Sequence, residues 1–550
     1  MNTLSLSLAF IGLVAAISWP LGRWLVWTLQ GRSLDPYFRR LLGSGMDQSS
    51  GWKNYFLALL AFNGAMFVVT WLVLTFQQHL TLNPDAMGPV KPSLVFNTVA
   101  SFVTNTNLQH YSGEATYSYL SQLTLMWLQF TSAASGIAVL AALARGLSGS
   151  REFGNFSRDV VRILVLFLVP LAVIWAVIYS LVGVPMTFEG SAIATTLEGA
   201  TQTIARGPVA AFLAIKQLGT NGGGFFGPNS THPLENPGLI ANFISLVAIP
   251  LIPMACVWAF GSILGRPRHA RVISAVMFAF LTLKVVCTVL PESAPTHALH
   301  GLPVVESVNL EGKELRLGAT TGPLWAVLTT STSNGSVGAM HGSLNPLSLI
   351  GPFAGLWLNA TFGGVGVGMI NFFLFMILAV FVAGLMVGRT PEYLGKKVEA
   401  REMALAAATF LIHPILILSS SALFAVTSWG ASTINNPGAR GLSEIIYEFS
   451  SAAANNGSGL EGLSDNTAPW NIATAIVMLL GRYLPILLPL AIAGSLAAKP
   501  TVATSSGTLS TDTPTFGLMV FAIIFFLGAL TFFPAALLGP ILEHLSNLKS

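Results

Sequence analysis

The feature that most constrains the fold is a series of apolar stretches, each long enough to cross a lipid bilayer. A helix needs about 20 mostly apolar residues to span a hydrocarbon core of roughly 30 Å. Only 9% of the 550 residues are charged, whereas soluble domains average about 25%. This deficit excludes a soluble multi-domain enzyme and a disordered chain, and it predicts an all-α polytopic membrane protein. The ten predicted transmembrane helices are residues 3–28, 54–78, 117–145, 162–182, 239–264, 272–290, 345–388, 403–428, 471–496 and 516–541.

The lysines and arginines of the connections give the orientation of these spans, because positively charged segments resist translocation. One set of alternate connections holds 16 of these residues and the other set holds seven. The richer set therefore marks the cytoplasm, which places both termini outside and agrees with an even number of spans. The net charge of +4 is small and dispersed, so the sequence predicts no nucleic-acid partner.

The seventh span is too long for one straight crossing. Pro346 to Val387 is 42 residues, about 63 Å as a helix, and a glycine-rich run interrupts it. Two full crossings here would move every later basic connection to the other side of the membrane, so one interrupted passage is predicted. The glycines of the break are Gly363, Gly364, Gly366 and Gly368.

Four of the outer connections contain a similar polar tetrad. A shared asparagine (105, 221, 334 and 456) recurs at intervals of 116, 113 and 122 residues, with one span before and one span after each copy. A Gly or Pro stands 12 to 15 residues before each shared asparagine, followed by residues compatible with about three helical turns. Each connection thus predicts a short helix whose C-terminus points at its tetrad. The tetrads are Thr104-Asn105-Thr106-Asn107, Thr220-Asn221-Gly222-Gly223, Ser333-Asn334-Gly335-Ser336 and Asn455-Asn456-Gly457-Ser458.

Irregular backbone at membrane depth must line protein or a watery cavity, because amide groups without partners are costly in lipid. Four tetrads around one axis would supply such a cavity, and a ring of backbone carbonyls there could replace the hydration shell of a cation. Gly222, Gly335 and Gly457 are predicted to occupy equivalent positions, with Thr106 replacing glycine in the first copy. Asn-Gly pairs are also ordinary turn formers, but four copies in register favour the cation site over independent turns.

The expected organisation is four pseudo-symmetric span–pore helix–span repeats around a central ion pore, with an extra span at each end of the chain. Each repeat would contribute one tetrad to the pore. The predicted boundaries are 1–50 for the N-terminal span and its connection, 51–150, 151–270, 271–400 and 401–500 for the repeats, and 501–550 for the C-terminal span.

Three long strings of the sequence are specific enough to carry a family resemblance. The first runs from Gly219 to Phe226 and continues through His232-Pro233 to Glu235-Asn236-Pro237; the second is Gly388 to Lys397; the third is the first tetrad with Gln109 and Tyr111 to Glu114. These strings resemble the potassium-binding subunits of the bacterial Kdp potassium-transporting ATPases, within the superfamily of K+ transporters. The match in span order covers essentially the whole chain.

This resemblance implies that the chain binds extracellular K+ in a four-loop selectivity filter and passes it into an intramembrane path. A partner P-type ATPase subunit would hydrolyse ATP, and two small single-span accessory subunits would join them in the bacterial inner membrane. K+ is then the transported ion, membrane lipids surround the chain, and no covalently bound cofactor is expected. The filter residues would be Asn105, Thr106, Asn107, Gln109, Thr220, Asn221, Gly222, Gly223, Ser333, Asn334, Gly335, Asn455, Asn456 and Gly457.

The sequence supports a division of labour between subunits. It contains neither an Asp-Lys-Thr-Gly phosphorylation motif nor a Walker A pattern, so no catalytic centre is predicted in this chain. The break at Gly363–Gly368 would be, by the same resemblance, a gating loop beneath the filter. The alternative function is a self-sufficient K+ channel or an ion-coupled K+ symporter of the same superfamily, and a membrane scaffold without transport is the third hypothesis.

Two charged residues inside spans need a reason, because a charge at the bilayer centre costs at least about 2.5–3.5 kcal/mol. Arg482 resembles the arginine of the family in that span, and we expect it to face the pore as a fixed positive charge. Lys284 is expected to reach toward the outer interface, with its stem covered by neighbours. Asn359, just before the glycine break, stands near the place where some members of the family carry an acidic residue.

Overall fold

A computed structural model describes residues 3–31, 35–43, 45, 48–295, 303, 308–388, 390–502 and 509–548. Three of the bases counted above, Arg32, Arg389 and Lys549, lie outside the described residues. Within the described ranges, ten helical segments are long and apolar enough to cross a bilayer, which confirms the ten predicted spans. They are α1 (Thr3–Gln30), α3 (Trp52–Thr75), α6 (Tyr119–Leu147), α7 with α8 (Phe156–Ile163 and Val169–Leu181), α10 (Leu239–Ile263), α11 (Pro267–Glu292), α14 (Val367–Val387), α15 (Ala400–Val426), α18 (Ala468–Ala498) and α19 with α20 (Pro514–Ala536 and Leu542–Asn547).

The fourth span begins six residues before its predicted start at 162. Asn155 caps α7 by accepting a hydrogen bond from the backbone N–H of Arg158 (3.0 Å), which satisfies one of the free donors of the first turn. The charged turn before the apolar stretch is therefore helical as well. A π-helical turn, Leu164–Leu168, joins α7 to α8 just before Pro170, which cannot donate a backbone hydrogen bond to a regular helix.

Four short helices, α4, α9, α12 and α17, end directly before the four tetrads, as predicted. Nearly all residues of α9 and α12, and most of α4 and α17, are buried, so these helices lie inside the bundle rather than on its surface. Pro92 stands at the start of α4, where a helix has no partner for its first N–H groups. Their bounds are Pro92–Val103 for α4, Val209–Leu218 for α9, Thr321–Ser331 for α12 and Gly438–Ala453 for α17.

The seventh span is interrupted, as predicted. The helix α13 ends at Leu358, and Asn359 follows it with a positive φ of +41°. The helix α14 begins at Val367, so the irregular break covers residues 359–366. Gly368 was expected in the break but lies in the first turn of α14, because the backbone returns to helical geometry at Val367.

The remaining elements are small. Among the residues that the structure describes, two antiparallel strand pairs lie in the loops between helices, and each pair consists of two strands alone. These elements are α2 (Asp35–Leu42), α5 (Gly113–Thr116), α13 (Ile350–Leu358), α16 (Ser428–Ala431), β1 (Ala192–Thr195), β2 (Thr201–Ile204), β3 (Glu392–Tyr393) and β4 (Lys396–Lys397), the π turn Leu537–Ile541, and the 3-10 turns Gln77–His79, Asn229–Thr231, His341–Ser343 and Pro346–Leu349.

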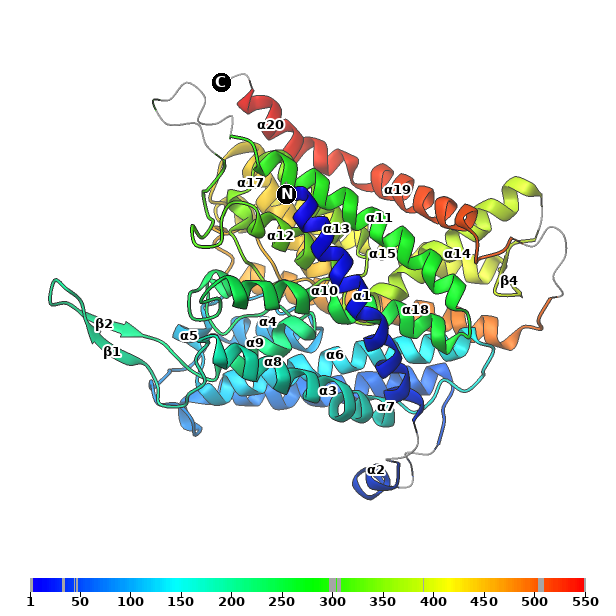
Figure 1. Ribbon diagram of the computed structural model, residues 1–550, viewed down its shortest axis with the longest axis horizontal. Coiled ribbons are helices and arrows are strands. Elements are labelled where there is room, and N and C mark those ends of the chain that lie inside the picture. Colours follow the sequence, from blue (N-terminus) through cyan, green and yellow to red (C-terminus); the bar gives the residue numbers. More distant parts are fainter. Residues whose placement is uncertain are drawn as a thin grey trace.

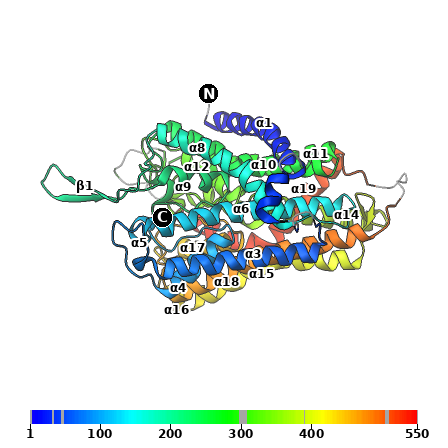
Figure 2. The same ribbon diagram turned by 90° about the horizontal axis from the view of Figure 1, so that it is seen from below.

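Most of the long helices run roughly along the horizontal axis of Figure 1, whereas α1 crosses them at a steep angle, and the four short helices gather in the left half. The β1–β2 hairpin projects from that same end, and α1 begins and α20 ends toward it. The view from below shows the hairpin standing clear of the helical body (Figure 2). Apolar residues of α6, α10, α11 and α14 form much of the buried core, which also includes apolar residues of the short helices α4, α9 and α12.

Candidate functional site

The four tetrads form a closed ring at the C-terminal ends of the short helices. We call them tetrad 1 (104–107), tetrad 2 (220–223), tetrad 3 (333–336) and tetrad 4 (455–458). Side-chain amides connect each neighbouring pair of repeats, so the ring closes through the order 1, 2, 3, 4 and back to 1. The contacts are Asn105 Nδ2 to Thr220 O (2.9 Å), Asn334 Nδ2 to Gln217 O (3.2 Å), Asn456 Nδ2 to Thr329 O (2.9 Å) and Asn455 Nδ2 to Thr106 Oγ1 (2.9 Å).

The backbones of the ring also approach one another closely. A Cβ added to any of three tetrad glycines would overlap a carbonyl oxygen of the next repeat, and backbone cannot move aside as a flexible side chain can. These pairs are Gly222 with Asn334, Gly335 with Asn456, and Gly457 with Thr106. The glycines are therefore required by space as well as by their backbone angles.

The backbone angles correct the predicted alignment of tetrad 1. Each repeat has two residues with positive φ, separated by one residue, and the second is Gly222, Gly335 or Gly457 in three of the repeats. In the first repeat it is Asn107, so Thr106 does not replace glycine as predicted. The pairs are Thr220 (+49°) and Gly222 (+79°), Ser333 (+48°) and Gly335 (+89°), Asn455 (+51°) and Gly457 (+106°), and Asn105 (+67°) and Asn107 (+56°).

The shared asparagine caused this error of one residue. Asn221 stands three residues after the end of α9, whereas Asn105 stands only two after the end of α4. The structural counterpart of Asn221 is Thr106, because the backbone N–H of each donates to a carbonyl five residues earlier, at 2.9 Å for Thr106 and 3.1 Å for Asn221. Asparagine tolerates positive φ better than most residues, which explains Asn107 at a glycine position.

Two glutamines hold the first and second repeats together. Gln109, predicted as a filter residue, uses its whole amide on Gly224: its Nε2 donates to the carbonyl (3.0 Å) and its Oε1 accepts from the N–H (2.7 Å). Gln129, in α6, donates to Asn107 Oδ1 and to the carbonyl of Gly223, both at 3.0 Å. The Gln109 side chain therefore holds the backbone of Gly224, directly after tetrad 2. Gln129 has a similar role, which the sequence analysis missed.

Lys216 is a second residue that the sequence analysis missed, because it was counted as a base of an outer connection. It is fully buried in α9, and its amino group forms an ion pair with Glu235 (2.5 Å). Its carbonyl accepts from the N–H groups of Asn221 and Gly222 (both 3.1 Å), while Glu235 accepts from the N–H of Phe225 (2.8 Å). Lys216 therefore holds the backbone within tetrad 2, and Glu235 holds the backbone just after it. Glu235 belongs to one of the strings that carried the family resemblance, and this is the signal that could have found the pair.

The glycine break of the seventh span lies against the ring. The N–H of Gly363 donates to the carbonyl of Ser331 (2.8 Å), at the end of α12. The N–H of Val365 donates to Thr220 Oγ1 (3.0 Å), the first side chain of tetrad 2. The break therefore contacts the second and third repeats at the start of tetrad 2 and at the end of α12.

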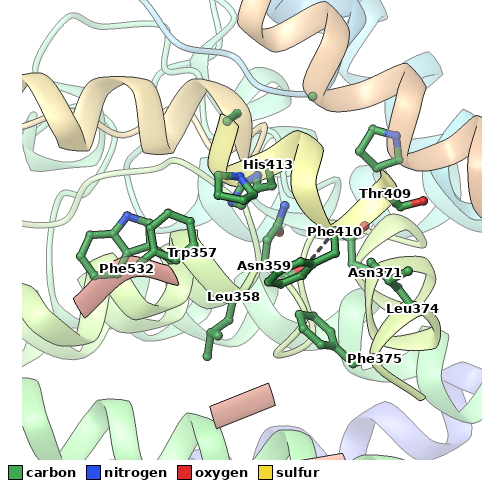
Figure 3. A pocket seen from close by; sticks show the side chains of 14 residues that line it. Trp357, Leu358, Asn359, Asn371, Leu374, Phe375, Thr409, Phe410, His413 and Phe532 are labelled. Atoms are coloured by element: carbon green, nitrogen blue, oxygen red, sulfur yellow. Dashed lines mark hydrogen bonds between the residues drawn. The ribbon is translucent and has the colours of Figure 1, made fainter. Parts of the chain in front are cut away.

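A small cavity lies beside Asn359, at the start of this break. Asn359 Oδ1 accepts from Ser333 Oγ (2.7 Å), and its carbonyl accepts from Asn371 Nδ2 (2.9 Å). Figure 3 shows both asparagines among aromatic and apolar side chains, with His413 above them. The cavity has a volume of about 50 Å³. Asn359 thus connects Ser333 of tetrad 3 to Asn371, and both asparagines line the small cavity.

Arg482 and Lys284, the charged residues of spans that the sequence analysis singled out, differ in their surroundings. Arg482 is buried in α18, and its Nη2 donates to the carbonyl of Ser132 (3.4 Å), close to where Gly136 of α6 meets Val365 of the break. Lys284 is only 3% exposed, and its amino group has no hydrogen-bond partner among the described residues. The prediction that Lys284 reaches the outer interface is therefore wrong, because α11, α13 and α19 enclose its side chain in an apolar cavity.

A larger cavity of about 430 Å³ lies on the outer side of the ring, with Gly335 and Gly457 in its wall. Its charged side chains include His110, Glu461 and Asp465. Burial raises the pKa of Glu461 to about 7. Burial lowers the pKa of His110, but the facing carboxylates of Asp465 and Glu448 outweigh this and raise it to about 9. Carboxylates outnumber bases here, so the cavity can concentrate cations above the ring.

The ring has the physical requirements of a cation site. Four helices end at it, and the partial negative charge of each C-terminus converges on the same place. The alternating positive φ angles turn successive backbone carbonyls away from regular helical directions, and carbonyl oxygens are the ligands that replace water around a monovalent cation.

Comparison with known proteins gives a consistent result. The sequence matches the family described as potassium-transporting ATPase A subunit over residues 8–545. Proteins named potassium-transporting ATPase potassium-binding subunit from Flavobacterium psychrophilum and Geobacillus kaustophilus are 46% and 45% identical to it, over 98% and 97% of both chains. The crystal structure of the potassium transporter TrkH from Vibrio parahaemolyticus shares the fold, with a TM-score of 0.53 at 13% identity, covering 89% of this chain and 98% of that one. The chain therefore belongs to the family of potassium-transporting ATPase A subunits.

Proposed function

We propose that this chain binds extracellular K+ between the four tetrads and passes it into a path within the membrane, as the potassium-binding subunit of an ATP-driven uptake pump. The closed ring of tetrads is the observation that carries the proposal. Its filter residues are those predicted from the sequence, with Asn107 in the glycine position of the first repeat. The names of the relatives support the same function.

The four repeats, with boundaries at 51–150, 151–270, 271–400 and 401–500, would each supply one quarter of the filter. The end of the bundle that carries the tetrads and the hairpin would face outward, in a bacterial inner membrane, with both termini on that side. The positions of the start of α1 and the end of α20 support this orientation, as does the low number of basic residues in the connections of that side.

Beneath the filter, the break at 359–366 would act as the gate. Its N–H groups hold Thr220 and Ser331, and the positive charge of Arg482 lies close by. An ion leaving the filter would meet this charge and be slowed, unless the loop moves. The small cavity beside Asn359 would be the first part of the path that leads the ion away from the pore axis.

ATP hydrolysis would reside on a P-type ATPase partner, with small single-span subunits completing the complex. The alternative, a self-sufficient channel or symporter, predicts sustained K+ flux through this chain alone in liposomes. The pump predicts no such flux without the ATPase subunit. Flux measured with the purified chain, before and after assembly with its partners, separates the two.

The filter is tested by Gly222→Ser in the assembled complex. Gly222 has a φ of +79°, and an added Cβ would overlap the carbonyl oxygen of Asn334. Overpacking of this kind costs about 1–3 kcal/mol, so the half-saturating K+ concentration for ATP hydrolysis should rise about fivefold to a hundredfold. Discrimination against Na+ and Rb+ should fall as well.

Gly64→Ser is the matched control, because Gly64 lies in the span α3 and an added Cβ there meets no atom within 4 Å. This variant should keep the wild-type half-saturation. An unchanged half-saturation and unchanged ion selectivity in Gly222→Ser, with K+ stimulation intact, would refute the filter assignment.

A further inference from the structure

A cluster of one imidazole and two carboxylates stands at the outer mouth of the ring. His110 follows Gln109 in the chain and is fully buried, Glu448 belongs to α17 and is 2% exposed, and Asp465 lies in the loop before α18 and is 24% exposed. His110 Nε2 lies 3.2 Å from Glu448 Oε1 and 3.9 Å from Asp465 Oδ2. All three side chains line the outer cavity of about 430 Å³. The cluster thus bridges the first and fourth repeats and remains open to ions in that cavity.

The hydrogen bonds of His110 require a positive species between these groups. His110 Nδ1 lies 2.7 Å from Asn471 Oδ1, and the Nδ2 of Asn471 is directed at Ser93 Oγ (3.4 Å) and Asn466 Oδ1 (3.3 Å). An amide oxygen only accepts hydrogen bonds, so Nδ1 carries a hydrogen. In the neutral ring the lone pair then sits on Nε2 and points at the carboxylate of Glu448. Two such groups at 3.2 Å repel each other unless a proton or a metal ion lies between them.

The ligand atoms suit a transition-metal ion. Bonds of about 2.0–2.1 Å to Zn²⁺ in a tetrahedral site place neighbouring ligand atoms about 3.3–3.4 Å apart. The His110–Glu448 separation of 3.2 Å fits this value. Asp465 lies 3.9 Å from His110, and all three ligand atoms lie within 4.8 Å of one another, so Asp465, on a partly exposed loop, must move closer to complete the site. A histidine ligand usually donates its other N–H to an oxygen acceptor, as Nδ1 of His110 does to Asn471. K+, Ca²⁺ and Mg²⁺ prefer oxygen ligands alone, so the imidazole selects against them.

We propose that His110, Glu448 and Asp465 form a binding site for a divalent transition metal of the Zn²⁺ class at the outer mouth of the filter. The cavity would supply water as the fourth ligand. A bound metal takes the place of the proton on His110 and adds net positive charge to the cluster, which weakens the attraction of the cavity for cations. External Zn²⁺ therefore raises the half-saturating concentration of K+, an effect that rests on the function proposed above, whereas the binding itself does not.

Binding is tested first, with ZnCl₂ titrated calorimetrically into the purified full-length chain without K+. We expect one metal per chain, and the visible absorption of Co²⁺ in the same site should report mixed nitrogen and oxygen ligands. His110→Gln and Asp465→Asn should each weaken binding about tenfold or more. The matched control is Glu461→Gln, because Glu461 lines the same cavity but bonds to the N–H of Gly342 (2.8 Å) instead; it should leave metal affinity unchanged.

Absence of binding, or binding that is indifferent to both substitutions, would overturn the proposal and leave a proton on His110 as the positive species. If His110→Gln does not fold, Asp465→Asn still tests the site, because it changes a residue of a partly exposed loop. An unchanged thermal unfolding midpoint would show that this variant is folded. The second measurement is the half-saturation of the assembled complex for K+ with and without Zn²⁺. A wild-type complex whose chain binds Zn²⁺ but whose K+ response does not change would refute the coupling to the filter. A wild-type complex whose ATP hydrolysis does not respond to K+ in the absence of Zn²⁺ would instead refute the proposed function.

Discussion

The first tetrad and the fourth tetrad both have a positive φ at equivalent positions, but they reach it with different residues. Asn107 (φ +56°) and Gly457 (φ +106°) hold equivalent positions, yet an added Cβ at Gly457 would overlap the carbonyl oxygen of Thr106. Asn107 has its Cβ and side chain in place. The difference shows that positive φ is the common requirement of the ring, and that glycine is required only where a neighbour also fills the space of a Cβ.

The space for Asn107 comes from the second repeat. Gly223 follows Gly222, and a Cβ on it would stand 2.8 Å from the Cβ of Asn107 and 2.9 Å from Cζ of Phe102. The third and fourth repeats carry Ser336 and Ser458 at the corresponding place. The second glycine of tetrad 2, Gly223, therefore leaves the space that the side chain of Asn107 in tetrad 1 occupies. The ring keeps its pseudo-symmetry because these two positions differ from their counterparts together.

The largest effect is expected for Gly457→Asn, which gives the fourth repeat the residue of the first. The φ of +106° at Gly457 lies beyond the left-handed angle of about +57° that asparagine tolerates, so the variant combines backbone strain with the loss of space. The backbone carbonyl of Thr106 must move, and with overpacking near 3 kcal/mol the half-saturating K+ concentration should rise about a hundredfold. K+-stimulated ATP hydrolysis of the assembled complex measures it.

Gly199→Asn is the matched control, because Gly199 has a φ of +84° in the turn of the β1–β2 hairpin and an added Cβ meets no atom within 4 Å. It should behave as the wild type. If Gly457→Asn kept wild-type affinity, the positions would be interchangeable and the comparison between the tetrads would fail.

A smaller effect is expected for Gly223→Ala, because the new methyl group would lie 2.8 Å from Cβ of Asn107 and 2.9 Å from Cζ of Phe102, a milder overlap than the one between a Cβ on Gly457 and the carbonyl oxygen of Thr106. The cost should lie near 1 kcal/mol, so K+ half-saturation should rise less than about tenfold. Asn107→Gly alone should change it about twofold or less, since only the bond from Gln129 is lost and backbone freedom at positive φ is kept.

The double variant then decides whether the two positions are coupled. Gly223→Ala combined with Asn107→Gly should recover most of the affinity lost in Gly223→Ala, because the two side chains no longer compete for one space. Additive losses in a double-mutant cycle would show that Gly223 is needed for another reason.

The sequence predicted the parts of the fold that depend on composition along the chain. Ten spans follow from apolar length, and the break in the seventh follows from 42 residues with a glycine run. The short helices before the tetrads follow from Gly or Pro starts and from the repeat. These features are local, so one sequence contains them.

Other features depend on contacts between distant segments, and the sequence analysis missed or misplaced them. The register of tetrad 1 was wrong by one residue because identical side chains do not mark equal distances from a helix end. Lys216 counted as a loop base because its ion pair with Glu235 forms only in the folded chain. Lys284 was expected at the interface, but three helices enclose it. Gln129 lies in a span whose composition gives no sign of its bonds to the ring.

The central claim is that the four tetrads together hold one file of K+ ions, and ion density tests it most directly. Tl⁺ can replace K+ and scatters anomalously, so crystals of the complex grown with Tl⁺ locate the ion. The account predicts peaks on the axis enclosed by residues 105–107, 220–222, 333–335 and 455–457, and their loss in Gly457→Asn. Peaks confined to the outer cavity, or none between the tetrads in a complex that Tl⁺ stimulates, would contradict it.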